Sequence, residues 1–199
     1  ITDTVSVAAG IRVMQNTFLA PIAADTTSVF AITNLTSAAT NSDPGMQITA
    51  GLSSPAHPRN VVITLNDPDN SITGGTARVT GLDARGELRA EIITLVASSG
   101  GSSTNTGAVA FAVVTRIDLY DLNGVTLFPP PVDTVSVGVG EKFGLTGVLG
   151  SAADVLYVSE DGKVITSGYS VDATTGQQGI TFAVPPNGSR DYIVVFRTR

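Results

Sequence analysis

The chain has 199 residues with no cysteine and one histidine, and it carries a formal net charge of -6 with a pI near 4.5. Disulfides, thiolate chemistry and zinc sites built from Cys or His are therefore excluded. The two lysines and nine scattered arginines form no basic patch, and no apolar run approaches the roughly 20 residues of a spanning helix. We therefore expect neither a nucleic-acid partner nor a membrane partner. The charged share of 14% is low, which is typical of a surface that faces other protein.

Residues 1–24 differ from the rest of the chain, because their apolar residues follow no clear period. We interpret this stretch as an extended N-terminal arm whose apolar side chains need a partner surface. An ordinary first strand followed by a loop is the alternative interpretation. The residues predicted to contact a partner are Ile11, Val13, Met14, Phe18, Leu19 and Arg59.

From residue 25 onward, short β-rich runs alternate with clusters of Asp, Asn, Gly and Pro. The main runs cover residues 26–33, 61–65, 76–81, 87–95, 108–119, 133–137, 155–159, 179–184 and 192–196. No stretch shows a sustained helical period with caps at both ends. This pattern predicts an all-β fold, namely an antiparallel β-sandwich or barrel of roughly ten short strands. We assign residues 25–199 to one domain, with a sub-boundary considered at the proline-rich residues 129–132.

Two dipeptides predict tight hairpins within this pattern. Asn123-Gly124 and Asp161-Gly162 both accept the positive φ angles that a primed two-residue turn requires. We expect residues 125–128 to return as a strand after the first hairpin, and residues 163–166 to return after the second.

The acidic turns are the best place to look for a metal site. Asp67 and Asp69 lie in one turn and Asp83 lies in the next, and carboxylate oxygens are the ligands that calcium prefers. These three are weak candidates, because the twelve-residue loop with a distal Glu is missing and acidic turns commonly bond their own backbone. The sequence therefore predicts no metal and no cofactor.

No group is placed convincingly for catalysis. His57 is flanked by Pro55 and Pro58, and no Gly-x-Ser-x-Gly elbow occurs in the chain. Glu87 and Glu91 share one strand face, which suits a solvated edge better than a carboxylate pair for glycoside cleavage. We therefore predict no catalytic residues and a protein that is not an enzyme.

Several motifs together carry a family resemblance: PRNVVITL at 58–65, ITGGT at 72–76, TGLDARG at 80–86 with EII at 91–93, and DTVSVGVGEKFGL at 133–145. They resemble small virion proteins of tailed bacteriophages that are encoded among head-morphogenesis genes. The resemblance implies a capsid decoration (head auxiliary) protein, and the family offers no catalytic residues.

Composition agrees with the function that this resemblance implies. An acidic protein suits the outer capsid surface better than the DNA-packed interior, and a chain without Cys suits assembly in the reducing cytoplasm of a host bacterium. The expected partners are the major capsid protein and further copies of the chain in a homotrimer, which would match local three-fold positions of an icosahedral lattice. The alternative is a receptor- or glycan-binding module of a head fibre or tail.

Overall fold

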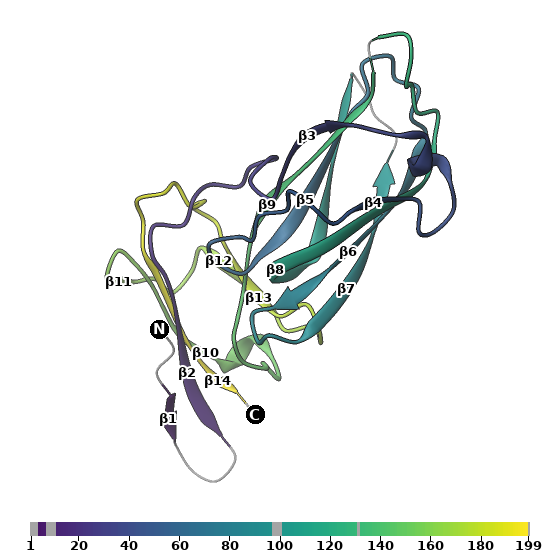
Figure 1. Ribbon diagram of the computed structural model, residues 1–199. Helices are drawn as coiled ribbons and strands as arrows, with labels where there is room; N and C mark the ends of the chain where they lie inside the picture. The colour runs from purple at the N-terminus through teal and green to yellow at the C-terminus, as the bar shows by residue number, and fades with distance from the viewer. Residues whose placement is uncertain (1–3, 7–10, 97–100, 131, 199) are drawn as a thin grey trace.

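The computed structural model in Figure 1 describes residues 4–6, 11–96, 101–130 and 132–198. These residues form fourteen β-strands in two sheets, with two single-turn 3-10 helices, η1 (Ser37–Thr40) and η2 (Ala152–Asp154). Every strand pair is antiparallel. The predicted all-β antiparallel fold is confirmed, with more strands than the roughly ten expected from the sequence.

Nine strands form the larger sheet, in the order β12-β13-β9-β5-β8-β6-β7, with β3 added to β9 and β4 added to β8. Their bounds are β3 (Phe30–Asn34), β4 (Met46–Ile48), β5 (Arg59–Asn66), β6 (Gly74–Asp83), β7 (Leu88–Val96), β8 (Ser102–Asn123), β9 (Thr134–Gly144), β12 (Tyr169–Asp172) and β13 (Gly179–Phe182). The long β8 pairs with β5 along its first half and with β6 along its second half. It therefore joins the two halves of the sheet.

The larger sheet curls around its own core, so that β7 approaches the first half of β8. Glu91 on β7 accepts hydrogen bonds from the amides of Ala108 and Val109, and Asn105 on β8 accepts one from the Val96 amide. A Cβ at Gly107 would lie only 2.5 Å from the Glu91 carboxylate, so a larger residue here would displace this carboxylate. Inward side chains of β5, β6, β7, β8 and β9 fill the enclosed space.

Five strands form the smaller sheet, in the order β1-β2-β14-β10-β11. Their bounds are β1 (Thr4–Ser6), β2 (Arg12–Phe18), β10 (Val155–Glu160), β11 (Lys163–Val164) and β14 (Tyr192–Thr198). Asp161 and Gly162 both have positive φ between β10 and β11, which confirms the second predicted hairpin. For the first predicted hairpin, at Asn123-Gly124, the predicted return strand is wrong. The chain turns at Gly124, but residues 125–128 form no strand, and the next strand is β9.

A second core lies between the smaller sheet and the end of the larger one (Figure 1). Its aromatic rings form a chain in which Phe143 lies 4.7 Å from Phe18 and 5.7 Å from Phe182, and Phe182 stacks on Tyr192 at 4.0 Å between centroids. β9 contributes to both cores, with Val137 in the first and Phe143 in the second. The two cores therefore share a continuous strand.

Among the described residues of the predicted N-terminal arm, Thr4–Ser6 and Arg12–Phe18 belong to the smaller sheet, whereas residues 1–3 and 7–10 lie outside the described ranges. Residues 12–18 form β2, which pairs with β1 on one side and with β14 on the other. Phe18 is only 3% exposed and belongs to the second core. For these residues the alternative of an ordinary strand describes the structure better than a separate arm.

Candidate functional site

An apolar row runs along the outer face of β7. Alternate residues from Leu88 to Val96 point away from the core, and Leu88, Ile92 and Val96 are 72%, 66% and 56% exposed. Ala90 and Thr94 complete the row, so this face of a strand of nine residues carries no charge. Their neighbours Ile93 and Leu95 point inward and are buried. An exposed apolar row of this length is suited to contact with another protein.

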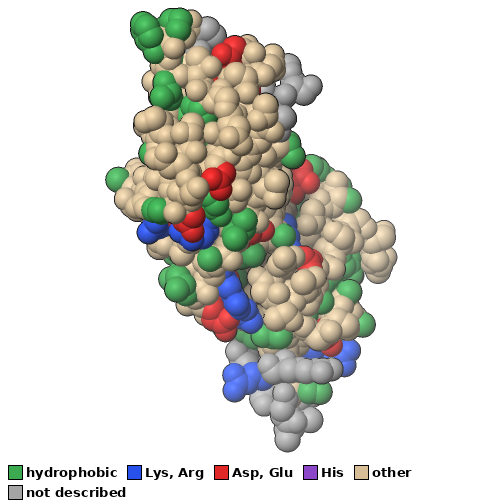
Figure 2. Space-filling view, turned by 90° about the vertical axis from the view of Figure 1, so that its right-hand side faces the viewer, with side chains coloured by type: hydrophobic (Ala, Val, Ile, Leu, Met, Phe, Trp, Pro, Cys, Tyr) green, Lys and Arg blue, Asp and Glu red, His purple; other side chains and the backbone are tan. Residues whose placement is uncertain are grey.

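Positive charge is unevenly distributed over one side of the molecule. Figure 2 shows Lys and Arg side chains in the middle and lower parts of that face, whereas small hydrophobic groups extend to its upper end. The hydrophobic side chains form several small groups and not one broad patch. Any contact through this face would therefore combine separate apolar groups with polar surroundings.

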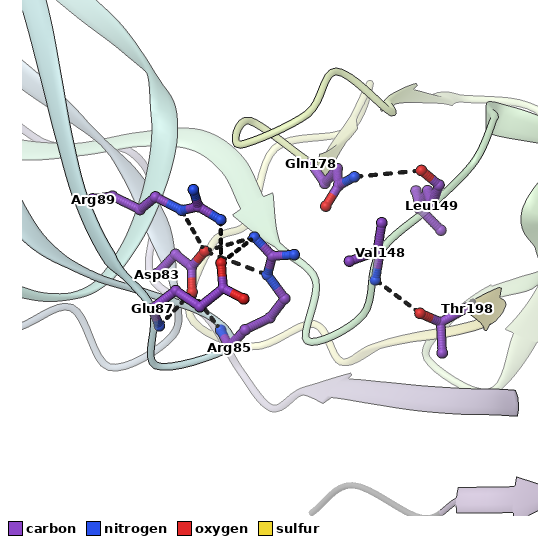
Figure 3. Close-up of polar contacts among 8 residues, drawn as sticks. All are labelled: Asp83, Arg85, Glu87, Arg89, Val148, Leu149, Gln178 and Thr198. Carbon is purple, nitrogen blue, oxygen red and sulfur yellow. Dashed lines mark hydrogen bonds and ion pairs between the residues drawn. The ribbon is translucent and has the colours of Figure 1, made fainter.

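Asp83 is the centre of an ion cluster at the turn between β6 and β7 (Figure 3). Its Oδ1 accepts hydrogen bonds from the amides of Arg85 (2.8 Å) and Glu87 (3.0 Å). Its Oδ2 accepts bonds from Arg85 Nη2 (3.0 Å) and Arg89 Nε (2.9 Å). Both oxygens are occupied by protein donors, so Asp83 is a poor metal ligand and its role is to fix the turn.

Burial alone would raise the pKa of Asp83, but hydrogen bonds from Arg89, from the Glu87 amide and from Arg85 lower it below its ordinary value of 3.8. The stabilisation from this carboxylate is therefore fully present above about pH 4 and is lost as the pH falls through the lower folded value. Asp83→Asn should reduce the free energy of unfolding by about 2–3 kcal/mol at pH 7. Urea titrations should show this difference shrinking at pH 2–3, and a difference that does not change with pH would contradict the assignment.

Two further contacts in Figure 3 fix the chain between β9 and β10. The Val148 amide donates to Thr198 Oγ1 at 2.8 Å, and Gln178 Nε2 donates to the Leu149 carbonyl at 3.3 Å. This connection is thereby held against the end of β14 and against the loop that precedes β13.

Three other carboxylates converge where β5 ends and β9 begins. One oxygen from each of Asp67, Asp69 and Asp133 lies within 4.8 Å of the others. The fold explains the meeting, because Asn66 pairs with Thr134 at the end of the β5–β9 ladder and the flanking residues follow directly. Asp67 and Asp133 are fully buried, whereas Asp69 is exposed. Of the weak candidates Asp67, Asp69 and Asp83, the first two lie in this cluster, whereas Asp83 does not and Asp133 is the third member.

Asp67 and Asp69 are held by the turn that contains them. The Oδ1 and Oδ2 atoms of Asp67 accept hydrogen bonds from the amides of Ser71 (2.9 Å) and Ile72 (2.8 Å). Thr126 Oγ1 donates to Asp69 Oδ2 at 2.7 Å. Hydrogen bonds from Ser71 and Thr126 lower the pKa of Asp69 to about 2. Asp69 is therefore ionised at neutral pH.

Asp133 differs from the other two carboxylates in having an oxygen without a donor. Its Oδ2 accepts a hydrogen bond from the Thr126 amide at 2.6 Å. Its Oδ1 is buried and has no hydrogen-bond partner among the described residues. Burial raises the pKa of Asp133, and the charges of Asp67 and Asp69 raise it further. Little in the sequence marks this residue as a ligand, because it precedes β9, far along the chain from the acidic turn.

His57 lies against the end of β2. Its Nε2 is 3.0 Å from the Leu19 carbonyl oxygen, and its ring meets the Phe18 ring edge-on at 5.8 Å. It lines a hollow of about 260 Å³ together with Ile22 and Pro55. Within the described parts of the chain, no Ser, Thr or Asp side chain forms a hydrogen bond with this imidazole.

A hollow of about 550 Å³ is an open groove beside β5 and β9 that Asn60, Thr106 and Lys142 help to line. Lys142 Nζ donates to the Ala108 carbonyl at 2.8 Å and forms an ion pair with Asp172. The ammonium is therefore already engaged within the chain.

Arg59 is buried in its own chain. Its Nε donates to the Gly140 carbonyl at 2.6 Å, and its Nη2 donates to the same oxygen. Its Nη1 donates to the Ile22 carbonyl at 2.6 Å. The guanidinium carbon lies 4.6 Å from the centroid of Phe143, in cation–π geometry. Burial lowers the pKa of Arg59 to about 10. Arg59 therefore ties the segment after β2 to β9.

The predicted interface residues thus divide into three groups by burial. Ile11 and Leu19 are 42% and 62% exposed, so they remain available to a partner. Phe18 and Arg59 are a correction, because both are buried by contacts within the same chain. The two other predicted residues, Val13 and Met14, are partly buried in β2.

Comparisons with protein-family models, with curated proteins and with solved structures found no match to this chain. No helix among the described residues has the length and hydropathy needed to span a bilayer.

Proposed function

We propose that this chain is a non-enzymatic structural protein of a bacteriophage particle, which binds the outer surface of the capsid and stabilises the contacts between capsomers. The motif resemblance between residues 58 and 145 suggests the class of particle. The apolar row on β7 is the observation that carries the proposal, because it offers a preformed contact surface on a rigid strand.

The position of β7 in the fold favours binding through this face. Side-chain bonds to β8 hold the strand from its other side, through Glu91 and Asn105. The exposed side chains of Leu88, Ile92 and Val96 therefore need no rearrangement before they meet a partner. A preorganised surface loses little conformational entropy on binding.

Net charge supports the outer surface over the interior of the shell. At -6, the chain would be repelled by packaged DNA. We propose a homotrimer as the bound form, since closed symmetric assemblies are usual and three-fold positions recur on an icosahedral lattice. Light scattering should then give three times the chain mass of 20.3 kDa.

Co-sedimentation with empty, expanded capsids that lack decoration tests the proposal, with free capsid subunits as the comparison. The wild-type chain should pellet with capsids in a saturable manner. Ile92→Glu, which places a charge in the middle of the β7 row, should weaken binding by about tenfold or more. Val164→Glu is the matched control, because Val164 is 60% exposed but lies on β11 in the smaller sheet. It should bind like the wild type.

Binding to neither capsids nor subunits would overturn the proposal. Binding to host cells or glycans in place of capsids would favour the alternative of a receptor-binding head-fibre or tail module. Equal losses for the Ile92 and Val164 variants would show that β7 is not the contact face.

A further inference from the structure

We propose that Asp67, Asp69 and Asp133 bind a divalent cation of the oxygen-preferring class, calcium in the first place. The site is independent of the proposed function, because it rests only on contacts within the chain. One oxygen from each carboxylate lies within 4.8 Å of the others. Asp69 and Asp133 form no ion pair with a Lys or Arg in the described ranges, so no basic side chain there compensates their charge.

The buried oxygen of Asp133 points to a missing partner. Buried polar atoms are nearly always hydrogen-bonded, and one left without a partner is costly. Asp133 is fully buried and its Oδ1 has no hydrogen-bond partner among the described residues, although the amide of Thr126 satisfies Oδ2. A cation between the three carboxylates would supply that partner and would offset their mutual repulsion.

The chemistry of the site selects the class of ion. All three proposed ligands are carboxylates, and the hydroxyls of Ser71 and Thr126 lie alongside at 3.2 Å from each other. Such hard oxygen ligands suit calcium or magnesium and not the softer transition metals. Two ligands on calcium, each roughly 2.3–2.6 Å from the ion, can lie about 5 Å apart, whereas magnesium permits about 4 Å. The three carboxylate oxygens lie within 4.8 Å of one another, a separation that ligands on one calcium ion can have.

A bound cation would join two segments that are distant in sequence. Asp67 and Asp69 belong to the turn after β5, while Asp133 ends the loop between β8 and β9. That loop carries Leu127 and Phe128, which are 41% and 85% exposed. Ion binding would thus fix the base of a loop with an exposed apolar tip.

Isothermal titration of the full-length chain, first stripped with EDTA, tests the site directly. CaCl2 should bind at one site with a dissociation constant of roughly 10⁻⁵ to 10⁻³ M. At a hundredfold excess over that constant, calcium should raise the Tm by about 5–10 °C. Amide hydrogen exchange between residues 124 and 128 should slow when calcium is added.

Matched variants separate this site from general charge effects. Asp133→Asn and Asp69→Asn should each weaken calcium binding by at least tenfold. Because Asp69 is exposed, its variant keeps the fold even if the Asp133 variant does not. Glu160→Gln removes a partly buried carboxylate of the smaller sheet, which pairs with Arg190, and should leave calcium affinity unchanged. Absence of binding heat and of any Tm shift at about 10 mM CaCl2 would overturn the proposal. Wild-type affinity in the Asp69 variant would overturn it too, and equal affinity for MgCl2 would overturn the choice of calcium.

Discussion

Deleting residues 1–24 is expected to unfold the smaller core while the larger core keeps its β-structure. The deletion removes β1 and β2 from the smaller sheet and leaves one edge of β14 unpaired from Tyr192 to Thr198, while its other edge still faces β10. It also removes Phe18, whose ring packs on Phe143. Loss of a buried Phe side chain alone costs about 3–5 kcal/mol.

Hydrogen exchange of the deleted chain provides the measurement. Amides of β14 and β10 should lose their protection, whereas those of β5 and β8 should retain it. A shorter deletion of residues 1–10 is the matched control, because it leaves β2 in place and should preserve β14 protection. Full protection of β14 after the longer deletion would contradict this expectation and would favour the first interpretation, in which residues 1–24 form an extended arm.

Arg59→Ala is expected to lower the free energy of unfolding by about 3–5 kcal/mol. The substitution leaves the carbonyls of Gly140 and Ile22 without their donor and removes the cation that packs on Phe143. Thermal and urea unfolding of the purified variant would measure the loss. This residue connects the segment after β2 with β9, so both cores should be affected.

Arg59→Lys is the informative comparison for this site. A lysine keeps the positive charge but lacks the planar fork that reaches both carbonyls at once, so its stability should fall between those of the wild type and the Ala variant. If the Ala variant instead unfolds like the wild type and loses only capsid binding, Arg59 contacts a partner and the buried assignment is wrong.

The strands were predictable because turn-forming residues mark their ends, and this signal is local in the sequence. Asp161-Gly162 specifies its hairpin by backbone conformation alone, and the structure has positive φ at both positions. Asn123-Gly124 carries the same signal, yet the return strand is missing. The reason lies in the following segment. The Thr126 amide donates to the Asp133 carboxylate, the Thr126 carbonyl accepts from the Asp133 amide, and the described residues between 125 and 133 form no strand.

Sites formed by distant residues were less accessible to sequence analysis. Asp67 and Asp69 stood out through their turn, but Asp133 joins them only because β5 and β9 are neighbours in the sheet. Likewise, nothing local separates Phe18, which is buried, from Leu19, which is exposed. The order in which the strands pair decides which carboxylates meet and which side chains are buried. Short strands of similar composition do not reveal that order in their sequences.

A cryo-electron microscopy reconstruction of capsids incubated with this chain tests the central claim most directly. The account predicts added β-rich density on the outer surface, at or near three-fold positions, with β7 facing the shell. Capsids that show no added density, or particles in which the chain is found only on the tail, would contradict it.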